Sequence, residues 1–289
     1  MTNRIKSMFI GAYPMVAMGI AAYAGWEAFQ TGDWLWLAPL LGVVPFLMFL
    51  SRVMLLRDVA RTSGSFPGFN ALAWAGVAWA VYGVLRDQGD PAVLALAGAA
   101  ALGFGVYSVW YSRLGCPESK LRVGAPLPAL RLRNSQGDAW DSESLAGRPA
   151  LLFFFRGNWC PLCMAQIKEV AARYREIAET GTQVLFVSPQ PQENSAALAA
   201  RFDAPMTFLV DDKLEAARAL GLDMEHGLPA GMGVLGYEST TVYPTVIVVD
   251  AAGVVRWLDE TDNYRVRPEP DTFLPLLRKL AQDRPSAAA

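Results

Sequence analysis

Residues 150–163 read ALLFFFRGNWCPLC, and this stretch decides the fold of the second half of the chain. Its first six residues form an unbroken apolar run, as a strand buried on both faces of a sheet requires. Gly157 and Asn158 then favour a turn, and Pro161 suits the first position of a helix because its missing N–H would have no partner there. The segment therefore predicts a central strand, a short turn and a helix that begins near Cys160.

Two cysteines, Cys160 and Cys163, lie three residues apart at the start of this helix. The spacing places both thiols on one side of the first turn, close enough to form a disulfide. The free amides at the helix N-terminus favour a thiolate, so we expect Cys160 to be the nucleophile and Cys163 the resolving thiol. The alternatives are two inert core thiols and half of a zinc site, for which only Cys116 and His226 remain as further ligands. We predict a redox pair, with no metal and no cofactor.

The sequence on either side of this segment alternates strand and helix patterns. We expect strands at residues 127–133, 150–155, 184–187, 207–210, 245–249 and 254–258 and helices at residues 160–180, 196–202, 214–220 and 272–280. This order predicts an α/β fold, a mixed central sheet with helices on both faces. The connection at residues 221–243 is long for a compact domain, which indicates either a functional lid or a disordered insert.

The first part of the chain is far more apolar than the second. Residues 1–112 hold 11 charged side chains, whereas residues 113–289 hold 41. Four uncharged apolar stretches, each near the length needed to cross a bilayer as a helix, predict an all-α transmembrane bundle. The stretches cover residues 7–26, 34–50, 69–85 and 92–110. We therefore expect a membrane region at 1–112, a linker at 113–124, the α/β domain at 125–283 and a tail at 284–289.

The distribution of Lys and Arg predicts the orientation of this bundle. Ten of these residues lie at the N-terminus, in the second loop and after the fourth stretch, against one, Arg86, in the two other loops. Positive charge stays on the cytoplasmic side, so we expect both termini there. A cleaved signal peptide is the competing interpretation of the first stretch, and it leaves the α/β domain on the same side.

Composition and charge exclude several classes of function. A net charge of −2 and a pI near 5.6 argue against nucleic-acid binding, and three cysteines are too few for a secreted disulfide scaffold. The first 112 residues contain neither cysteine nor histidine, so they offer no disulfide relay and no ordinary haem ligand. We expect this region to anchor the chain in the lipid bilayer or to dock a membrane-protein partner.

The run at residues 150–163, the stretch YPTVIVVD at residues 243–250 and the stretch DNYRVR at residues 262–267 resemble the thioredoxin fold. More narrowly, they resemble peroxiredoxin-like redoxins of the alkyl hydroperoxide reductase and thiol-specific antioxidant group, over about residues 120–283. The resemblance implies that Pro244 follows a cis peptide bond and faces the cysteine pair. It also implies that Trp159, Tyr243 and Pro244 contact the substrate.

The chain departs from the pattern of this group at several positions. Peroxidase members carry Thr or Ser three residues before the reactive cysteine and Pro four residues earlier, where this chain has Gly157 and Phe153. They also use an arginine near the position of Pro244. Thioredoxins carry a buried acid at the position of Phe154. Arg156, just before the turn, either adds positive potential there or is an exposed, solubilising residue, and we expect the second.

Together these features predict a membrane-anchored thiol–disulfide oxidoreductase that uses the Cys160 and Cys163 pair. The alternatives are a peroxiredoxin-like peroxidase, with Cys160 peroxidatic and Cys163 resolving, and a redox-sensing or docking module without catalysis. We expect a soluble electron donor of the thioredoxin or glutathione type and a disulfide or peroxide substrate. A multi-pass protein of a bacterial inner membrane, with its redoxin domain in the cytoplasm, is the expected setting.

Overall fold

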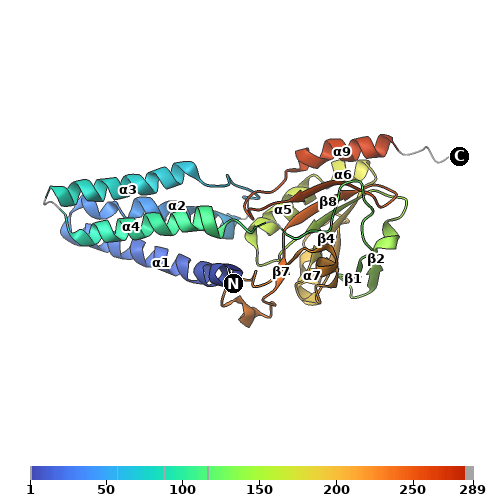
Figure 1. Cartoon of the computed structure of the whole chain (residues 1–289), viewed down its shortest axis with the longest axis horizontal. Coiled ribbons are helices and arrows are strands. Elements are labelled where there is room, and N and C mark those ends of the chain that lie inside the picture. Colours follow the sequence, from blue (N-terminus) through green and yellow to red (C-terminus); the bar gives the residue numbers. More distant parts are fainter. Residues whose placement is uncertain (1, 57, 87–88, 116, 284–289) are drawn as a thin grey trace. The chain divides into compact units, whose positions relative to one another are not determined.

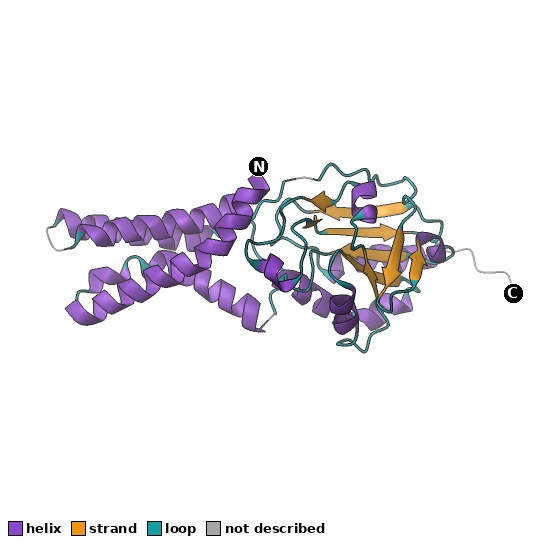
Figure 2. Ribbon diagram, turned by 90° about the horizontal axis from the view of Figure 1, so that it is seen from below, coloured by secondary structure: helices purple, strands orange, loops and turns teal. Residues whose placement is uncertain are grey.

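The computed structural model describes residues 2–56, 58–86, 89–115 and 117–283. The chain divides into two compact units, Met1–Arg113 and Leu114–Ala289. Figures 1 and 2 show that the first unit is built of helices and that the strands belong to the second. Cys116 and the tail at 284–289 lie outside the described residues, so the predictions for them stay predictions.

The first unit contains four long apolar helices. By length and composition each can cross a membrane, and they span Thr2–Thr31, Trp34–Leu56, Pro67–Leu85 and Pro91–Tyr111. Asp33 and Asp90 cap the N-termini of the second and fourth helices. Each carboxylate accepts a hydrogen bond of 2.8 Å from the backbone N–H two residues further along, that of Leu35 or Ala92. The predicted four helices are confirmed, and each is longer than its predicted stretch.

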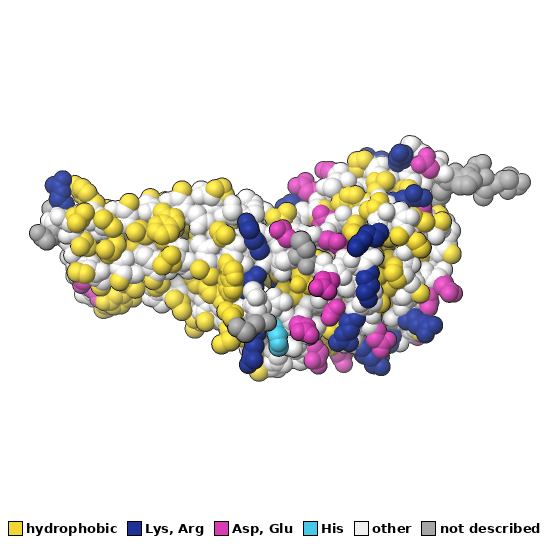
Figure 3. All heavy atoms as spheres, viewed as in Figure 1, with side chains coloured by type: hydrophobic (Ala, Val, Ile, Leu, Met, Phe, Trp, Pro, Cys, Tyr) yellow, Lys and Arg dark blue, Asp and Glu magenta, His cyan; other side chains and the backbone are white. Residues whose placement is uncertain are grey.

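Within these spans the helical geometry changes along the chain. The elements are α1 (Thr2–Thr31), η1 (Trp34–Leu37), α2 (Leu40–Ser51), the π-helical η2 (Arg52–Leu56), α3 (Pro67–Leu85), α4 (Pro91–Gly105) and the π-helical η3 (Val106–Tyr111). Small residues let the helices approach closely: a Cβ at Gly42 would lie 2.7 Å from that of Ala100. On the face drawn in Figure 3, hydrophobic side chains cover much of this unit, and charged side chains gather on the second unit.

The second unit is built on a seven-stranded mixed sheet of order β2-β1-β5-β4-β3-β8-β9. Three strands, β3, β4 and β5, are parallel, and the pairings of β1, β8 and β9 are antiparallel. The strands are β1 (Arg131–Asn134), β2 (Ala139–Asp141), β3 (Ala150–Phe154), β4 (Gln183–Ser188), β5 (Thr207–Val210), β8 (Thr245–Val249) and β9 (Val255–Glu260). The short β6 (Asp223–Met224) and β7 (Thr241–Val242) form a separate pair.

Helices cover both faces of this sheet, as the α/β prediction requires. The helices are α5 (Pro161–Ala172), α6 (Tyr174–Glu179), α7 (Gln192–Ala199), α8 (Glu215–Leu220) and α9 (Pro270–Gln282). On one face Phe153 stacks on Phe186 and packs against Phe273 of α9, at ring distances of 4.8 and 6.0 Å. On the other face Leu152 belongs to a buried cluster with Leu220 of α8. Alternate residues of β3 thus fill two cores.

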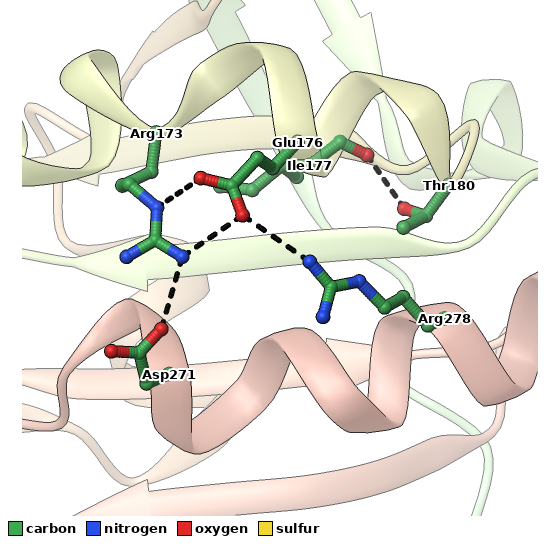
Figure 4. A network of polar contacts seen from close by, with 6 residues as sticks. All are labelled: Arg173, Glu176, Ile177, Thr180, Asp271 and Arg278. Carbon is green, nitrogen blue, oxygen red and sulfur yellow. Dashed lines mark hydrogen bonds and ion pairs between the residues drawn. The ribbon is translucent and has the colours of Figure 1, made fainter.

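The predicted single helix at 160–180 is wrong, because two helices meet at Arg173. The backbone of Arg173 leaves helical geometry at φ −101° and ψ 10°. Its guanidinium bonds Glu176 in the next turn and Asp271 of α9, at 3.0 Å, and Glu176 also accepts from Arg278 at 3.2 Å (Figure 4). This polar network ties α6 to α9. The second helix ends at Glu179, and Gly181, whose φ of +68° favours glycine, turns the chain just after it.

Candidate active site

The turn between β3 and α5 depends on a glycine. Gly157 has a φ of +138°, and a Cβ there would lie 2.7 Å from the indole nitrogen of Trp159. The carbonyl of Gly157 accepts the N–H of Cys160 at 3.1 Å, which closes the turn. The position at which peroxidase members carry Thr or Ser therefore has no room for a side chain, and the indole occupies that space.

The two cysteines lie together at the start of α5. Cys160 caps the helix from an extended conformation, Pro161 holds the first helical position, and Cys163 follows in the first turn. No disulfide joins the two cysteines, and their Sγ atoms lie 2.8 Å apart. Only 2% of Cys160 and 1% of Cys163 is exposed. The pair needs little movement to form a disulfide, and in this conformation its burial shields both sulfurs from other proteins.

Two buried arginines face the cysteine pair. Arg267, in the segment after β9, brings Nη2 to 3.7 Å from the Sγ of Cys163, and its Nε donates to the carbonyl of Tyr264 at 2.8 Å. Arg156 is also buried, so the prediction of an exposed residue is wrong. Its guanidinium lies 4.8 Å from the centre of the Trp159 ring and donates to the carbonyl of Gly227. A cation–π contact and a carbonyl thus offset part of the lost hydration of this cation.

The hydrogen bond between the two thiols and the nearby arginines favour the negative charge on one of the sulfurs. Burial acts to raise the pKa of the Cys163 thiol, but the hydrogen bond with Cys160, the charge of Arg267, and the N–H and charge of Arg156 together lower it to about 6. Burial and the same hydrogen bond raise the pKa of Cys160. The two sulfurs thus share one proton and one charge. The sequence predicts the thiolate at Cys160. The structure favours Cys163, because the hydrogen bond with Cys160 and then the charge of Arg267 lower the pKa of that thiol.

The connection at 221–243 is an ordered lid over this region. Arg156 contacts it twice, through Gly227 and through its own carbonyl, which accepts the hydroxyl of Thr241 at 2.9 Å. Further along the loop, the hydroxyl of Tyr237 donates to the side-chain oxygen of Asn158. The lone histidine of the loop, His226, is exposed. Of the two interpretations of this connection, the structure therefore favours the lid.

A second set of polar contacts, made by Gln190, holds the turn between β3 and α5. The N–H of Asn158 donates to the side-chain oxygen of Gln190 at 2.7 Å, and the amide nitrogen of Gln190 donates to Ser195 at 3.0 Å. Gln190 is buried, so its two hydrogen bonds fix the position of the turn. No signal in the sequence singles out Gln190 as part of the site.

The predicted substrate residues Tyr243 and Pro244 precede β8. Thr245, the first residue of β8, pairs with Phe154, so Pro244 lies at the end of the sheet that carries the cysteine turn. None of the peptide bonds in the described residues is cis, so the prediction of a cis bond before Pro244 is wrong. The N–H of Tyr243 donates to the carbonyl of Leu222 at 2.8 Å and keeps the chain extended between β7 and β8. A trans bond suits this extended path.

The chain is similar to several known proteins. Residues 123–258 match the AhpC/TSA family. The chain is 24% identical over 163 residues to chloroplastic peroxiredoxin Q of Sedum lineare, covering 56% of this chain and 81% of that protein. It is 26% identical over 111 residues to the putative peroxiredoxin bcp of Helicobacter pylori (strain ATCC 700392 / 26695), covering 37% of this chain and 73% of that protein. The crystal structure of peroxidoxin BcpB from Mycobacterium tuberculosis aligns with a TM-score of 0.46 at 17% identity, over 57% and 99% of the two chains.

The mixed sheet, with a cysteine pair where its central strand passes into a helix, defines a thioredoxin-like redox domain. The match at 123–258 places an AhpC/TSA redoxin domain within the second unit, and the peroxiredoxin relatives indicate an oxidoreductase. The predicted resemblance and fold class are confirmed.

Proposed function

We propose that this protein is a membrane-anchored thiol peroxidase in which Cys160 and Cys163 cycle between dithiol and disulfide. The burial of the pair behind two arginines carries the proposal. Only 2% of Cys160 is exposed. A peroxide can therefore approach the sulfur more easily than a disulfide of another folded protein can. The peroxiredoxins among the relatives support the same choice of substrate.

The chemistry follows from the shared proton. As the Cys160 sulfur attacks the peroxide, its proton passes to the Cys163 thiolate, 2.8 Å away. The O–O bond breaks, Cys160 becomes a sulfenic acid, and the departing alkoxide or hydroxide takes up a proton from solvent to leave as alcohol or water. Cys163 then attacks the sulfenic sulfur, which forms the disulfide and releases water. An external dithiol supplies two electrons to reduce the disulfide again.

The arginines take the place of the missing Thr or Ser. The peroxide cleavage develops negative charge on the departing oxygen, and a buried guanidinium stabilises such charge more strongly than a hydroxyl does. Arg267 lies close to the sulfurs, and Arg156 contributes both its charge and a backbone N–H. Gly157 leaves the space in which Trp159 packs on Arg156.

The electron donor is a soluble thiol protein or thiol of the thioredoxin or glutathione type. The Lys and Arg distribution supports a cytoplasmic position for the domain, in a bacterial inner membrane, where such donors are reduced. The four helices of the first unit serve as the anchor, and they also offer a surface for a membrane-protein partner.

A second candidate function, disulfide reduction, is favoured by one observation. The two-residue spacing between the cysteines is the arrangement of thiol–disulfide exchange motifs, and no side chain at position 157 positions a peroxide. This reaction needs the turn to open, so that Cys160 becomes accessible to another protein.

Turnover by the purified full-length chain in detergent tests the proposal. We expect hydrogen peroxide to be consumed at the expense of a reduced thioredoxin, and Cys160→Ser to abolish the reaction. Cys163→Ser should stop turnover after one oxidation and leave a sulfenic acid at Cys160, detectable by mass spectrometry. Cys116→Ser is the matched control and should retain activity. Reduction of insulin disulfides without peroxide consumption would establish the second candidate instead.

A further inference from the structure

The lid carries an exposed apolar tip. Residues 227–237 contain no charged side chain. Within them the short helix η5 (Met232–Leu235) is bounded by Gly231 and Gly236, whose positive φ angles turn the backbone on either side. Val234 is 88% exposed and Leu235 64%. We call residues 231–236 the tip; its two large aliphatic side chains project from the domain into the surroundings.

The tip is fastened to the active site at both ends. The N–H of Leu228 donates to the carbonyl of Ser239 at 3.1 Å, which closes the loop beneath the tip. Before the tip, Gly227 accepts from Arg156, and after it Tyr237 donates to Asn158. These contacts end on the turn that leads to Cys160, so the tip holds a fixed place beside the cysteine pair.

The connection to the apolar helices enters the domain at the same end of the sheet. The N–H of Leu114 donates to the carbonyl of Asp262, which follows β9, only three residues after η3 ends at Tyr111. The last residue of β9, Glu260, pairs with Thr245, and Thr245 pairs with the last residue of β3. The connection at Leu114, the turn that leads to Cys160 and the lid thus lie at the same end of the sheet. This holds for any orientation of the two units.

We infer that the tip docks into the headgroup layer of the bilayer that the helices of this same chain span. Val234 and Leu235 lose their exposure to water there, which favours docking. Because the helices already hold the domain at the bilayer, docking is intramolecular and needs far less buried area than a free protein would. Docking has a consequence that rests on the proposed function: it brings the cysteine pair close to hydroperoxides of membrane lipids.

The depth of a spin label at the tip tests the docking. The full-length Cys116→Ser chain, with Cys160 and Cys163 oxidised to their disulfide, receives Val234→Cys, a nitroxide label and phosphatidylcholine vesicles. The matched control carries Ala252→Cys, in the exposed turn between β8 and β9 at the opposite end of the sheet. We expect oxygen to relax the label at position 234 strongly and a water-soluble nickel complex to reach it poorly, with the reverse at position 252.

Equal access of the nickel complex to both labels would overturn the inference. This measurement needs no turnover, so its result stands even if the proposed function fails. The substrate consequence has a separate test in the double variant Val234→Ser, Leu235→Ser. We expect this variant to reduce a phospholipid hydroperoxide in the vesicles several-fold more slowly than the parent and hydrogen peroxide at the same rate. An equal change for both substrates would contradict the consequence.

Discussion

Arg267 brings its guanidinium to 3.7 Å from the Cys163 sulfur in a region with little water, where charges interact strongly. The pKa of Cys163, lowered to about 6, means that the thiolate is present above that pH and is lost as the pH falls through it. We expect the ultraviolet absorbance of the thiolate, and the rate of reaction with peroxide, to rise through about pH 6 and then level off.

Replacement of the arginine should move this midpoint. Arg267→Met removes a positive charge, so the pKa of Cys163 rises towards its ordinary value of 9.0, and each unit of rise lowers the thiolate fraction at lower pH about tenfold. Arg267→Lys should restore part of the effect. Arg131→Met is the control, since that side chain, in β1, is 90% exposed. An unchanged midpoint in folded Arg267→Met would contradict a role for this charge.

Gly157 is the second residue on which the site depends. In Gly157→Ala the new Cβ meets the Trp159 indole and the residue keeps a φ suited to glycine, so we expect a loss of about 1–2 kcal/mol from the backbone alone and more from the displaced ring. Thermal unfolding and peroxide turnover measure the two effects. Gly253→Ala separates them, because its φ is +77° but nothing lies within 4 Å of a Cβ there. Equal stability and activity in the two variants would rule out the packing argument.

Among the elements, the lid is anchored in the hydrophobic core near its ends by Leu222 and Val242, and polar contacts fasten the part between them to the cysteine turn. Tyr237→Phe removes the hydrogen bond to Asn158, which should cost the closed lid about 0.5–1.5 kcal/mol. We expect faster hydrogen exchange in residues 228–239 and unchanged exchange in β3. Tyr174→Phe is the matched control. It removes a hydrogen bond from the hydroxyl of Tyr174, on α6, to the carbonyl of Pro205, and it should leave the lid unaffected. Equal exchange in parent and Tyr237→Phe would contradict the fastening role.

The same scale shows what the sequence can predict. The strands at 207–210 and 245–249 match the structure residue for residue, because continuous apolar runs between turn formers report local burial. The buried arginines escaped prediction. Arg156 meets Gly227, 71 residues away, and Arg267 meets Cys163, 104 residues away. No local pattern reveals that a charged side chain will find such partners, so the sequence identifies the thiols of the site but not the groups that set their pKa.

At the scale of the whole molecule, the direction of electron flow depends on the side of the membrane that holds the redoxin domain. The ten Lys and Arg residues on one side of the helices predict that the redoxin domain lies in the cytoplasm. Thiol donors are reduced there, so they can reduce the disulfide between Cys160 and Cys163 back to the dithiol. The test replaces all three cysteines by serine and adds single cysteines at Gly32, between the first two apolar helices, or at Ala252. In intact cells a membrane-impermeant maleimide should label position 32 at once and position 252 only after the cells are opened. The reverse pattern would place the domain in an oxidising compartment, where a soluble donor of the cytoplasmic type cannot reduce the pair and the proposed cycle would need a donor delivered across the membrane.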